Sequence, residues 1–238
     1  WVVPQEFLDL YDPDSLSLPD YPEQAEAKRT GEWCSEAQLR SVRHGYYAMC
    51  SEVDHHCGRI LKTLEQRGFA EETIVIFTSD HGEFLGDFVR YQKGYPAPDC
   101  ISRVPFLCRW PDGGAAGGGT VSTFAEQVDV IPTLLHWCGV QTPPDLPGRP
   151  LPIGEGPETP RDSALTEHDG YKTLRTRRWR YLVDDKGRES LFDMDAPYAE
   201  YHDLAASAEH AEALAEMRRL LIQRLLQRER RAERIWCY

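Results

Sequence analysis

The feature that most constrains the fold is a long amphipathic helix that leads directly into a short, fully apolar strand. Apolar residues recur with the helical period from about Glu36 to Arg67, and Gly68 is a plausible stop. In "TIVIFT", Thr73–Thr78, β-branched and aromatic residues occupy both faces of the predicted strand. A strand that is apolar on both faces is typical of a sheet covered by helices on each side, which predicts an α/β fold.

Further elements of the same kind follow along the chain. A second apolar strand is expected at Pro105–Arg109, and a helix at Val130–Trp137. Asp129 is predicted to be the N-cap of that helix, and Gly139 to end it. Residues 1–32 are rich in proline and acidic residues and are expected to form loops.

The composition changes after residue 140. Residues 141–162 are rich in proline and glycine and resemble a linker. Short strands and a last helix are predicted beyond it, at Thr173–Thr176, Arg180–Val183, Ser190–Phe192 and Ala208–Arg234, with a turn at 184–187. We therefore expect residues 1–150 to be part of an α/β domain. Residues 151–238 are expected to form a small α+β subdomain with antiparallel strands and a terminal helix.

Charge and hydropathy exclude two classes of partner. The net charge is −12 and the pI about 5.1, whereas a nucleic-acid-binding surface must be basic. No apolar run approaches the roughly 20 residues that a membrane-spanning helix needs. We therefore expect neither nucleic acid nor a membrane to be a partner.

The seven cysteines show no CxxC pair, and an odd number favours free thiols in a reducing compartment. This favours a cytoplasmic location. The compartment stays open because the chain begins at Trp1 and its first methionine is Met49, so we expect the natural N-terminus to be missing. Cys50 and Cys57 are expected to share one helix face and to fill the interior.

The strand Thr73–Thr78 is followed by Asp80, His81 and Gly82, a combination with chemical potential. In open α/β sheets, ligands bind at the carboxyl ends of the strands. Asp80 and His81 can offer one oxygen and one nitrogen to a single cation, and Gly82 lets the backbone turn sharply. This pattern favours metal-assisted hydrolysis. The alternative is a strand cap, with Asp80 accepting backbone N–H bonds and His81 on the surface.

Longer stretches carry a family resemblance that covers about residues 1–225. The stretch "SDHGEFLGDFVRYQKG…ISRVPFLCRWP", then "VDVIPTLLHWCGV", "PGRPL" and "SLFDMDAPYAEYHDL", resembles the sulfatases of the alkaline-phosphatase superfamily, with the landmarks in the family's order. The resemblance implies an alkaline-phosphatase-like sandwich with a mainly parallel central sheet, of which this chain supplies a part. The activity that it implies is hydrolysis of a sulfuric ester.

The resemblance also implies roles for individual residues. Asp80 and His81 correspond to the family's second pair of metal ligands. Lys93 corresponds to the lysine that contacts the sulfate, where a fixed ammonium stabilises the charge that grows on the leaving oxygen. Arg103 is expected to be a structural tie at the entry of the second strand. Glu83 and Asp87 lie near the motif in sequence, without an assigned role.

The chain departs from the family pattern in several places. The family's nucleophile, a formylglycine, arises in C-x-P-x-R or S-x-P-x-R, and none of the seven cysteines has proline two residues later. The first pair of metal-binding aspartates is absent as well. We expect both upstream of Trp1, so the resemblance implies that this chain corresponds to the C-terminal half of a sulfatase. Phe88 stands where the family usually has histidine, and "YPAPDC" replaces its usual aromatic and acidic run, so specific substrate contacts are expected to differ.

The cofactor and the substrate stay open at this point. The resemblance implies Ca²⁺, whereas an imidazole ligand suits Mn²⁺ or Zn²⁺ better. The expected substrate is a small-molecule or carbohydrate sulfate ester. The alternatives are a phosphonate monoester or phosphodiester hydrolase of the same superfamily, or a non-catalytic sulfatase-like domain. The oligomeric state is not predicted.

One prediction concerns the chain by itself. Because it holds neither the nucleophile motif nor the first metal aspartates, residues 1–238 should not turn over an aryl sulfate. The measurement is p-nitrophenyl sulfate hydrolysis by the purified chain, with Asp80→Ala as the control. Turnover clearly above that of the control would contradict the prediction.

Overall fold

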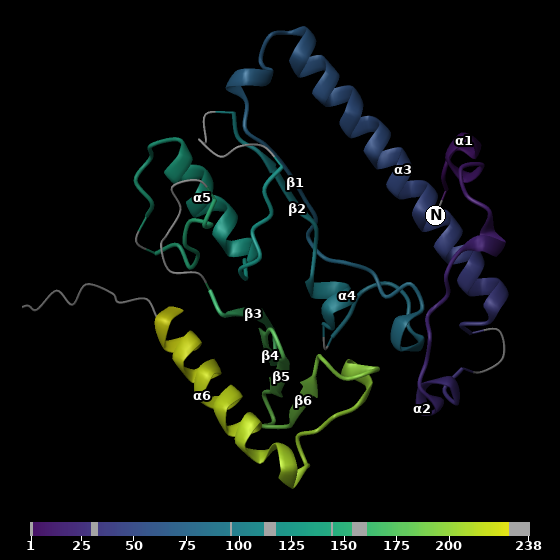
Figure 1. The fold of residues 1–238 in the computed structure, drawn as a ribbon, viewed down its shortest axis with the longest axis vertical. Coiled ribbons are helices and arrows are strands. Elements are labelled where there is room, and N and C mark those ends of the chain that lie inside the picture. The colour runs from purple at the N-terminus through teal and green to yellow at the C-terminus, as the bar shows by residue number, and fades with distance from the viewer. Residues whose placement is uncertain are drawn as a thin grey trace, which may run out of the picture. The chain divides into compact units, whose positions relative to one another are not determined.

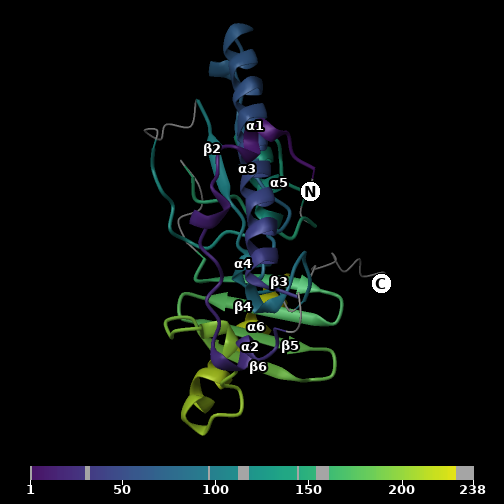
Figure 2. The same cartoon turned by 90° about the vertical axis from the view of Figure 1, so that its right-hand side faces the viewer.

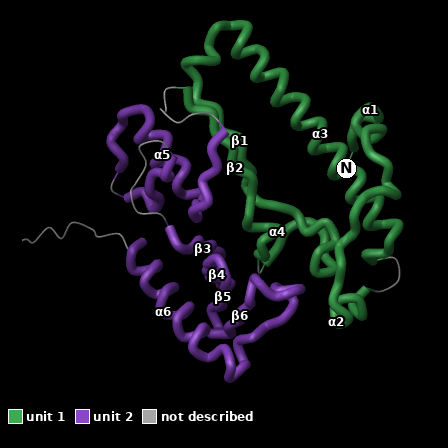
Figure 3. The backbone as a smooth tube through the Cα atoms, viewed as in Figure 1, with its two compact units in different colours: residues 1–112 green, residues 113–238 purple. Residues whose placement is uncertain are grey.

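The structure is a computed structural model that describes residues 2–29, 33–95, 97–111, 118–143, 145–153 and 161–228 (Figure 1). The chain forms two compact units, residues 1–112 and 113–238 (Figure 3). The sequence placed a domain boundary at residue 150 instead, and that boundary stays a prediction. Among the described residues, no helix is both long and apolar enough to cross a membrane.

The first unit is organised on α3, Glu36–Gln66, which confirms the long helix. Its first turn is capped by Ser35, whose hydroxyl accepts a hydrogen bond from the Gln38 N–H at 3.2 Å. The helix ends just before Gly68, whose left-handed φ of +75° terminates it, as the sequence predicted.

The segment before α3 contains more structure than the sequence predicted. It includes α1, Gln5–Leu8, and α2, Glu23–Glu26, joined by loops. Phe7 is buried, and His44 of α3 hydrogen-bonds the Leu8 carbonyl oxygen at 2.9 Å. These contacts fix the N-terminal segment on α3.

The sheet of the first unit consists of β1, Val75–Thr78, and β2, Phe106–Arg109. The two strands pair antiparallel, from Val75 opposite Arg109 to Thr78 opposite Phe106. The mixed α/β class is confirmed, but the parallel pairing predicted for the central sheet is not found between these two strands. Phe77 and Leu107 are 38% and 63% exposed, so within the described chain this small sheet is not covered on both faces.

The second unit contains α5, Val130–Trp137, with the predicted bounds, and a four-stranded antiparallel meander. Its strands are β3, Ser163–His168; β4, Tyr171–Thr176; β5, Trp179–Asp184; and β6, Glu189–Asp193. The sequence missed β3, whose polar residues lack a clear strand pattern and which owes its conformation to pairing with β4.

The last helix, α6, covers one face of the meander (Figures 1 and 2). It spans Ala211–Arg228, and the predicted extension to Arg234 lies outside the described residues. The core between sheet and helix is formed by Leu165, Leu174, Tyr181, Leu191, Leu214, Met217 and Leu221. Each strand of the meander contributes one of these side chains, so the helix holds all four strands together.

A buried cluster of charges ties α5 to β3 and α6. Asp129 is 1% exposed and accepts hydrogen bonds from both terminal nitrogens of Arg161. Glu126 forms ion pairs with Arg161 at 3.1 Å and with Arg224 at 2.6 Å. Buried charges are tolerated when they are paired in this way. Asp129 is the N-cap residue of α5, as the sequence predicted, but its carboxylate makes no capping hydrogen bond to this helix and binds Arg161 and the N–H groups of Glu126 and Arg149 instead.

The described part of the predicted linker packs against α5. The Arg149 N–H donates to Asp129 at 3.0 Å, and the Leu151 N–H donates to the Thr133 hydroxyl at 2.9 Å. Leu151 is 4% exposed. The prediction of a linker is therefore wrong for residues 145–153, and residues 154–160 lie outside the described residues.

The charge cluster generates a stability prediction. Arg161→Ala should lower the free energy of unfolding by about 3–5 kcal/mol, because it leaves two buried carboxylates short of their cation. The matched control is Arg178→Ala, which removes an exposed arginine paired with Asp193 and should cost much less, because ion pairs of exposed side chains contribute little to stability. Urea denaturation measures both. Equal losses would contradict this account of the cluster.

Candidate active site

Asp80 and His81 lie just beyond the carboxyl end of β1, as the sequence predicted, and their side chains face each other. The Asp80 Oδ2 to His81 Nε2 distance is 3.4 Å. The Asp80 side chain is 82% exposed and that of His81 36%. The His81 N–H donates to Asp80 Oδ1 at 2.9 Å. This backbone donor holds the pKa of the Asp80 carboxyl below its ordinary value, so the group is ionised at neutral pH.

The hydrogen bond on the other side of the imidazole orients the ring. His81 Nδ1 lies 2.8 Å from the Gly82 carbonyl oxygen, which can only accept, so Nδ1 carries a proton. In the neutral ring, Nε2 then points a lone pair toward the Asp80 carboxylate. A carboxylate oxygen and an imidazole lone pair repel each other unless a proton or a cation lies between them. A carboxylate oxygen and an imidazole nitrogen are both ligands that divalent cations take, so this pair fits such a cation as well as a shared proton.

Gly82 is required for close packing. A Cβ at this position would lie 1.9 Å from the Cys100 carbonyl oxygen. The Gly82 N–H also donates to the Ile101 carbonyl oxygen at 2.8 Å. The sequence assigned Gly82 to a sharp turn, whereas the contact in the structure is a close approach between two backbone segments.

Lys93 lies in the same connection between β1 and β2, and its side chain is exposed. It makes no hydrogen bond or ion pair with the other described residues. The backbone therefore sets where this flexible side chain leaves the loop, and with it the region that the ammonium group can reach. Beside it, Arg90 stacks on the Phe84 ring at 4.3 Å and fills the space next to Gly94.

The backbone before Lys93 is strained. Left-handed conformations occur at Leu85, Phe88, Val89 and Gln92, with φ of +47°, +59°, +58° and +66°. Each costs about 1–3 kcal/mol, and the β-branched Val89 is the least suited to this region. Such strain persists only where surrounding contacts impose it, and it is concentrated at functional sites.

Three side chains from the segments before and within α3 impose this shape. The Tyr21 hydroxyl donates to the Gly86 carbonyl oxygen at 2.6 Å, and the Trp33 indole to that of Val89 at 2.9 Å. Arg43 Nε donates to the Leu85 carbonyl oxygen at 3.1 Å. All three bind carbonyl oxygens, so the loop is held by its backbone. The sequence offered no signal for these contacts, because they join residues far apart in the chain.

The two acids near the motif have contacts that sequence reasoning could not assign. Asp87 lies 3.6 Å from the Arg43 guanidinium. Burial raises the pKa of its carboxyl, and the nearby arginine opposes that shift. Glu83 accepts hydrogen bonds from the N–H groups of Gln92 and Leu85.

Two other expectations receive no support from the structure. The Arg103 side chain is exposed and makes no hydrogen bond or ion pair with the described residues, although its backbone N–H donates to the Asp99 carbonyl oxygen at 2.9 Å. Cys50 is exposed on α3, so the prediction that it fills the interior is wrong. The apolar stripe of α3 predicted it to be buried, but in this unit the buried residues of the helix are Leu39 and Ala48.

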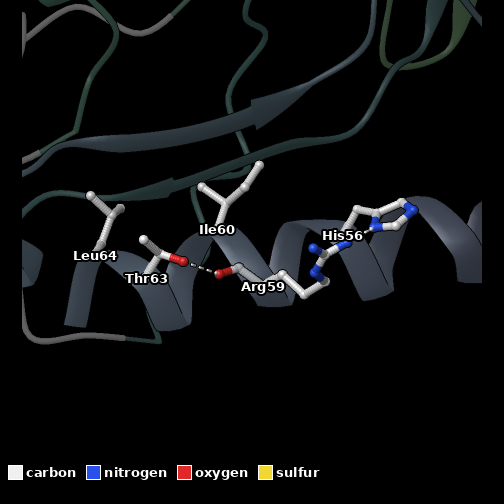
Figure 4. Close-up of a pocket in the computed structure, with 5 residues that line it drawn as sticks. All are labelled: His56, Arg59, Ile60, Thr63 and Leu64. Carbon is white, nitrogen blue, oxygen red and sulfur yellow. Dashed lines mark hydrogen bonds between the residues drawn. The ribbon is translucent and has the colours of Figure 1, made fainter. Parts of the chain in front are cut away.

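A groove of about 430 Å³ lies elsewhere, along the second half of α3 (Figure 4). It is lined by His56, Arg59, Ile60, Thr63 and Leu64. Its polar groups bind each other, since Arg59 hydrogen-bonds His56 at 3.1 Å and Thr63 donates to the Arg59 carbonyl oxygen at 2.8 Å. Asp80, His81 and Lys93 do not line it, so we do not assign the groove to the site.

The chain offers a cation only part of a coordination shell. Within the described residues, no group of three or more His, Cys, Asp or Glu side chains could hold a metal ion. Asp80 and His81 therefore make up an incomplete set of ligands.

Comparison of the sequence with known proteins identifies relatives of this chain. The sequence model of the family named Sulfatase matches residues 15–140. An arylsulfatase from Clostridium perfringens is 29% identical over 95% of this chain and 51% of its own length. An N-acetylglucosamine-6-O-sulfatase from Bacteroides thetaiotaomicron is 30% identical over 74% of this chain and 34% of its own. The chain thus spans about half or less of the length of these curated relatives.

Solved structures share the fold. A phosphonate monoester hydrolase from Silicibacter pomeroyi superposes with a TM-score of 0.86, at 24% identity, over 97% of this chain and 54% of its own. One from Agrobacterium radiobacter has a TM-score of 0.78, at 29% identity, over 83% of this chain and 44% of its own. These similarities confirm the fold class that the sequence predicted.

The packing at Gly82 generates a prediction with an internal control. Gly82→Ala should lower the free energy of unfolding by about 3 kcal/mol or more, because its Cβ would collide with the backbone at Cys100. Gly58→Ala, on open α3 surface, should instead raise stability by about 0.5–1 kcal/mol. Chemical denaturation measures both, and a neutral Gly82→Ala would contradict the close approach.

Proposed function

Because the chain belongs to the sulfatase family, we propose that it is part of a metal-dependent hydrolase that cleaves a sulfate monoester. The observation that carries the proposal is the pair of donors at the end of β1, Asp80 Oδ2 and His81 Nε2, 3.4 Å apart. Lys93 adds an exposed, positively charged side chain in the same connection between β1 and β2. Together they supply two ligands for a metal and one positive charge for an anionic group.

Each residue has a distinct role in this proposal. Asp80 and His81 hold the cation together with ligands from outside the described residues. A bound divalent cation would neutralise the sulfate and polarise its S–O bonds. The Lys93 ammonium contacts the sulfate and stabilises the negative charge that develops on the leaving oxygen. The formylglycine nucleophile is expected upstream of this chain.

The proposed metal is calcium, as the family resemblance implies. Asp80 is ionised and exposed, which suits a hard cation that prefers oxygen ligands. The imidazole of His81 favours Mn²⁺ or Zn²⁺ as the alternative. Activity measured on one preparation after each metal is removed and replaced by another decides between calcium and these alternatives.

The proposed substrate is a carbohydrate or other small-molecule sulfate ester. This is supported by the relative named N-acetylglucosamine-6-O-sulfatase, which is 30% identical over 74% of this chain. The second candidate is hydrolysis of phosphonate monoesters or phosphodiesters, which the 29% identical phosphonate monoester hydrolase supports. A non-catalytic sulfatase-like domain is the third possibility, and inactivity of the complete protein would favour it.

The experiment that tests the proposal compares p-nitrophenyl sulfate with a phosphonate monoester, in the protein that carries this chain together with the nucleophile segment. Each substrate is assayed after removal of metal and after addition of Ca²⁺ or Mn²⁺. We expect chelation to abolish activity and Ca²⁺ with the sulfate ester to give the highest kcat/KM. Preference for the phosphonate with Mn²⁺ would support the second candidate.

Lys93→Ala should lower kcat for p-nitrophenyl sulfate by about 10²- to 10³-fold, because one fixed positive charge is lost at the leaving oxygen. The loss should grow with the pKa of the leaving group, since poorer leaving groups develop more charge that needs stabilising. Lys62→Ala, which removes an exposed lysine of α3, is the matched control. Equal activity of the two variants would remove Lys93 from the mechanism.

A further inference from the structure

Glu83 links the two parts of the candidate site, which are the Asp80–His81 pair and Lys93. It follows His81 by two residues in the sequence, and its carboxylate accepts the backbone N–H of Gln92, the residue immediately before Lys93. The same oxygen also accepts the Leu85 N–H at 3.4 Å. A single side chain therefore spans the loop between the metal pair and the lysine.

The backbone that Glu83 holds is one that would not keep its shape unaided. Gln92 is left-handed, with φ +66°, and the Phe84 N–H donates to its carbonyl oxygen at 3.0 Å. Lys93 has no partner of its own among the described residues. The direction in which its side chain leaves the loop is thus set at Gln92, where Glu83 is the side-chain contact to the amide.

We propose that Glu83 is a positioning residue for the reaction: its hydrogen bond to the Gln92 amide places the Lys93 ammonium relative to Asp80 and His81. This inference rests on the proposed function of Lys93. Glu83 itself contacts neither substrate nor metal in this account. Misplacement of a catalytic group by about 1 Å can lower a rate about 100-fold, which makes such a contact kinetically visible.

The central experiment removes the acceptor and then restores it. Glu83→Ala, in the protein that carries the nucleophile segment, should lower kcat for an aryl sulfate about 10- to 100-fold, with KM changed less than kcat. Glu83→Gln should recover most of the rate, because its amide oxygen can still accept the Gln92 N–H. Glu36→Ala, which removes an exposed carboxylate paired with Arg40, is the matched control and should leave kcat unchanged.

Two further readouts separate positioning from a general loss of folding. The loss in Glu83→Ala should grow with leaving-group pKa, as expected for Lys93→Ala. The double variant Glu83→Ala/Lys93→Ala should be no slower than Lys93→Ala, because Glu83 acts through the lysine. Additive losses, or a loss independent of the leaving group, would overturn the proposal.

The outcomes also distinguish this inference from the proposed function. If Lys93→Ala is inactive while Glu83→Ala retains full activity, the lysine keeps its role and the positioning proposal fails. If Lys93→Ala is fully active, the proposed function of the lysine fails first. Should Glu83→Ala not fold, Glu83→Asp replaces it, since it keeps the charge but is one methylene shorter. Full activity of a folded Glu83→Asp would then count against the proposal.

Discussion

The antiparallel pairing of β1 with β2 is the constraint on which the candidate site depends. The last pair of the ladder, Thr78 opposite Phe106, brings together the two ends of the connection that carries Asp80, His81 and Lys93. Beyond the ladder, the Gly82 N–H donates to the Ile101 carbonyl oxygen, so the two segments stay side by side past the strands. Asp80 and His81 therefore lie between two fixed backbone contacts, although their side chains are partly or largely exposed.

The loop that follows is held in an unfavourable conformation by side chains distant in sequence. Tyr21, Trp33 and Arg43 all donate to carbonyl oxygens of the loop. Because these bonds reach the backbone, they constrain its path without specifying which side chains it carries. Phe88 lies in this loop in a left-handed conformation and packs edge-on against the Phe84 ring.

The sequence predicted the elements that have strong local patterns. The period of α3, the bounds of α5 and the position of Asp80 and His81 after β1 follow from patterning, capping residues and the motif. The polar strand β3 and the packing of residues 145–153 depend on distant partners and were missed. Asp129 illustrates the reason: its place before α5 favours a helix cap, whereas Arg161, far along the chain, binds its carboxylate. The strained conformation before Lys93 left no local pattern at all.

The two sheets differ in how much chain must be ordered before they can form. In the meander, β3, β4, β5 and β6 each pair with the next strand in sequence across a short turn. Between β1 and β2 lies the long connection 79–105. The entropic free-energy cost of bringing the ends of a loop together rises only about 0.6 kcal/mol for each doubling of its length. Pairing between strands far apart in the sequence nevertheless slows folding. The meander is thus suited to form early, whereas β1 and β2 can pair only once the long connection between them has been closed.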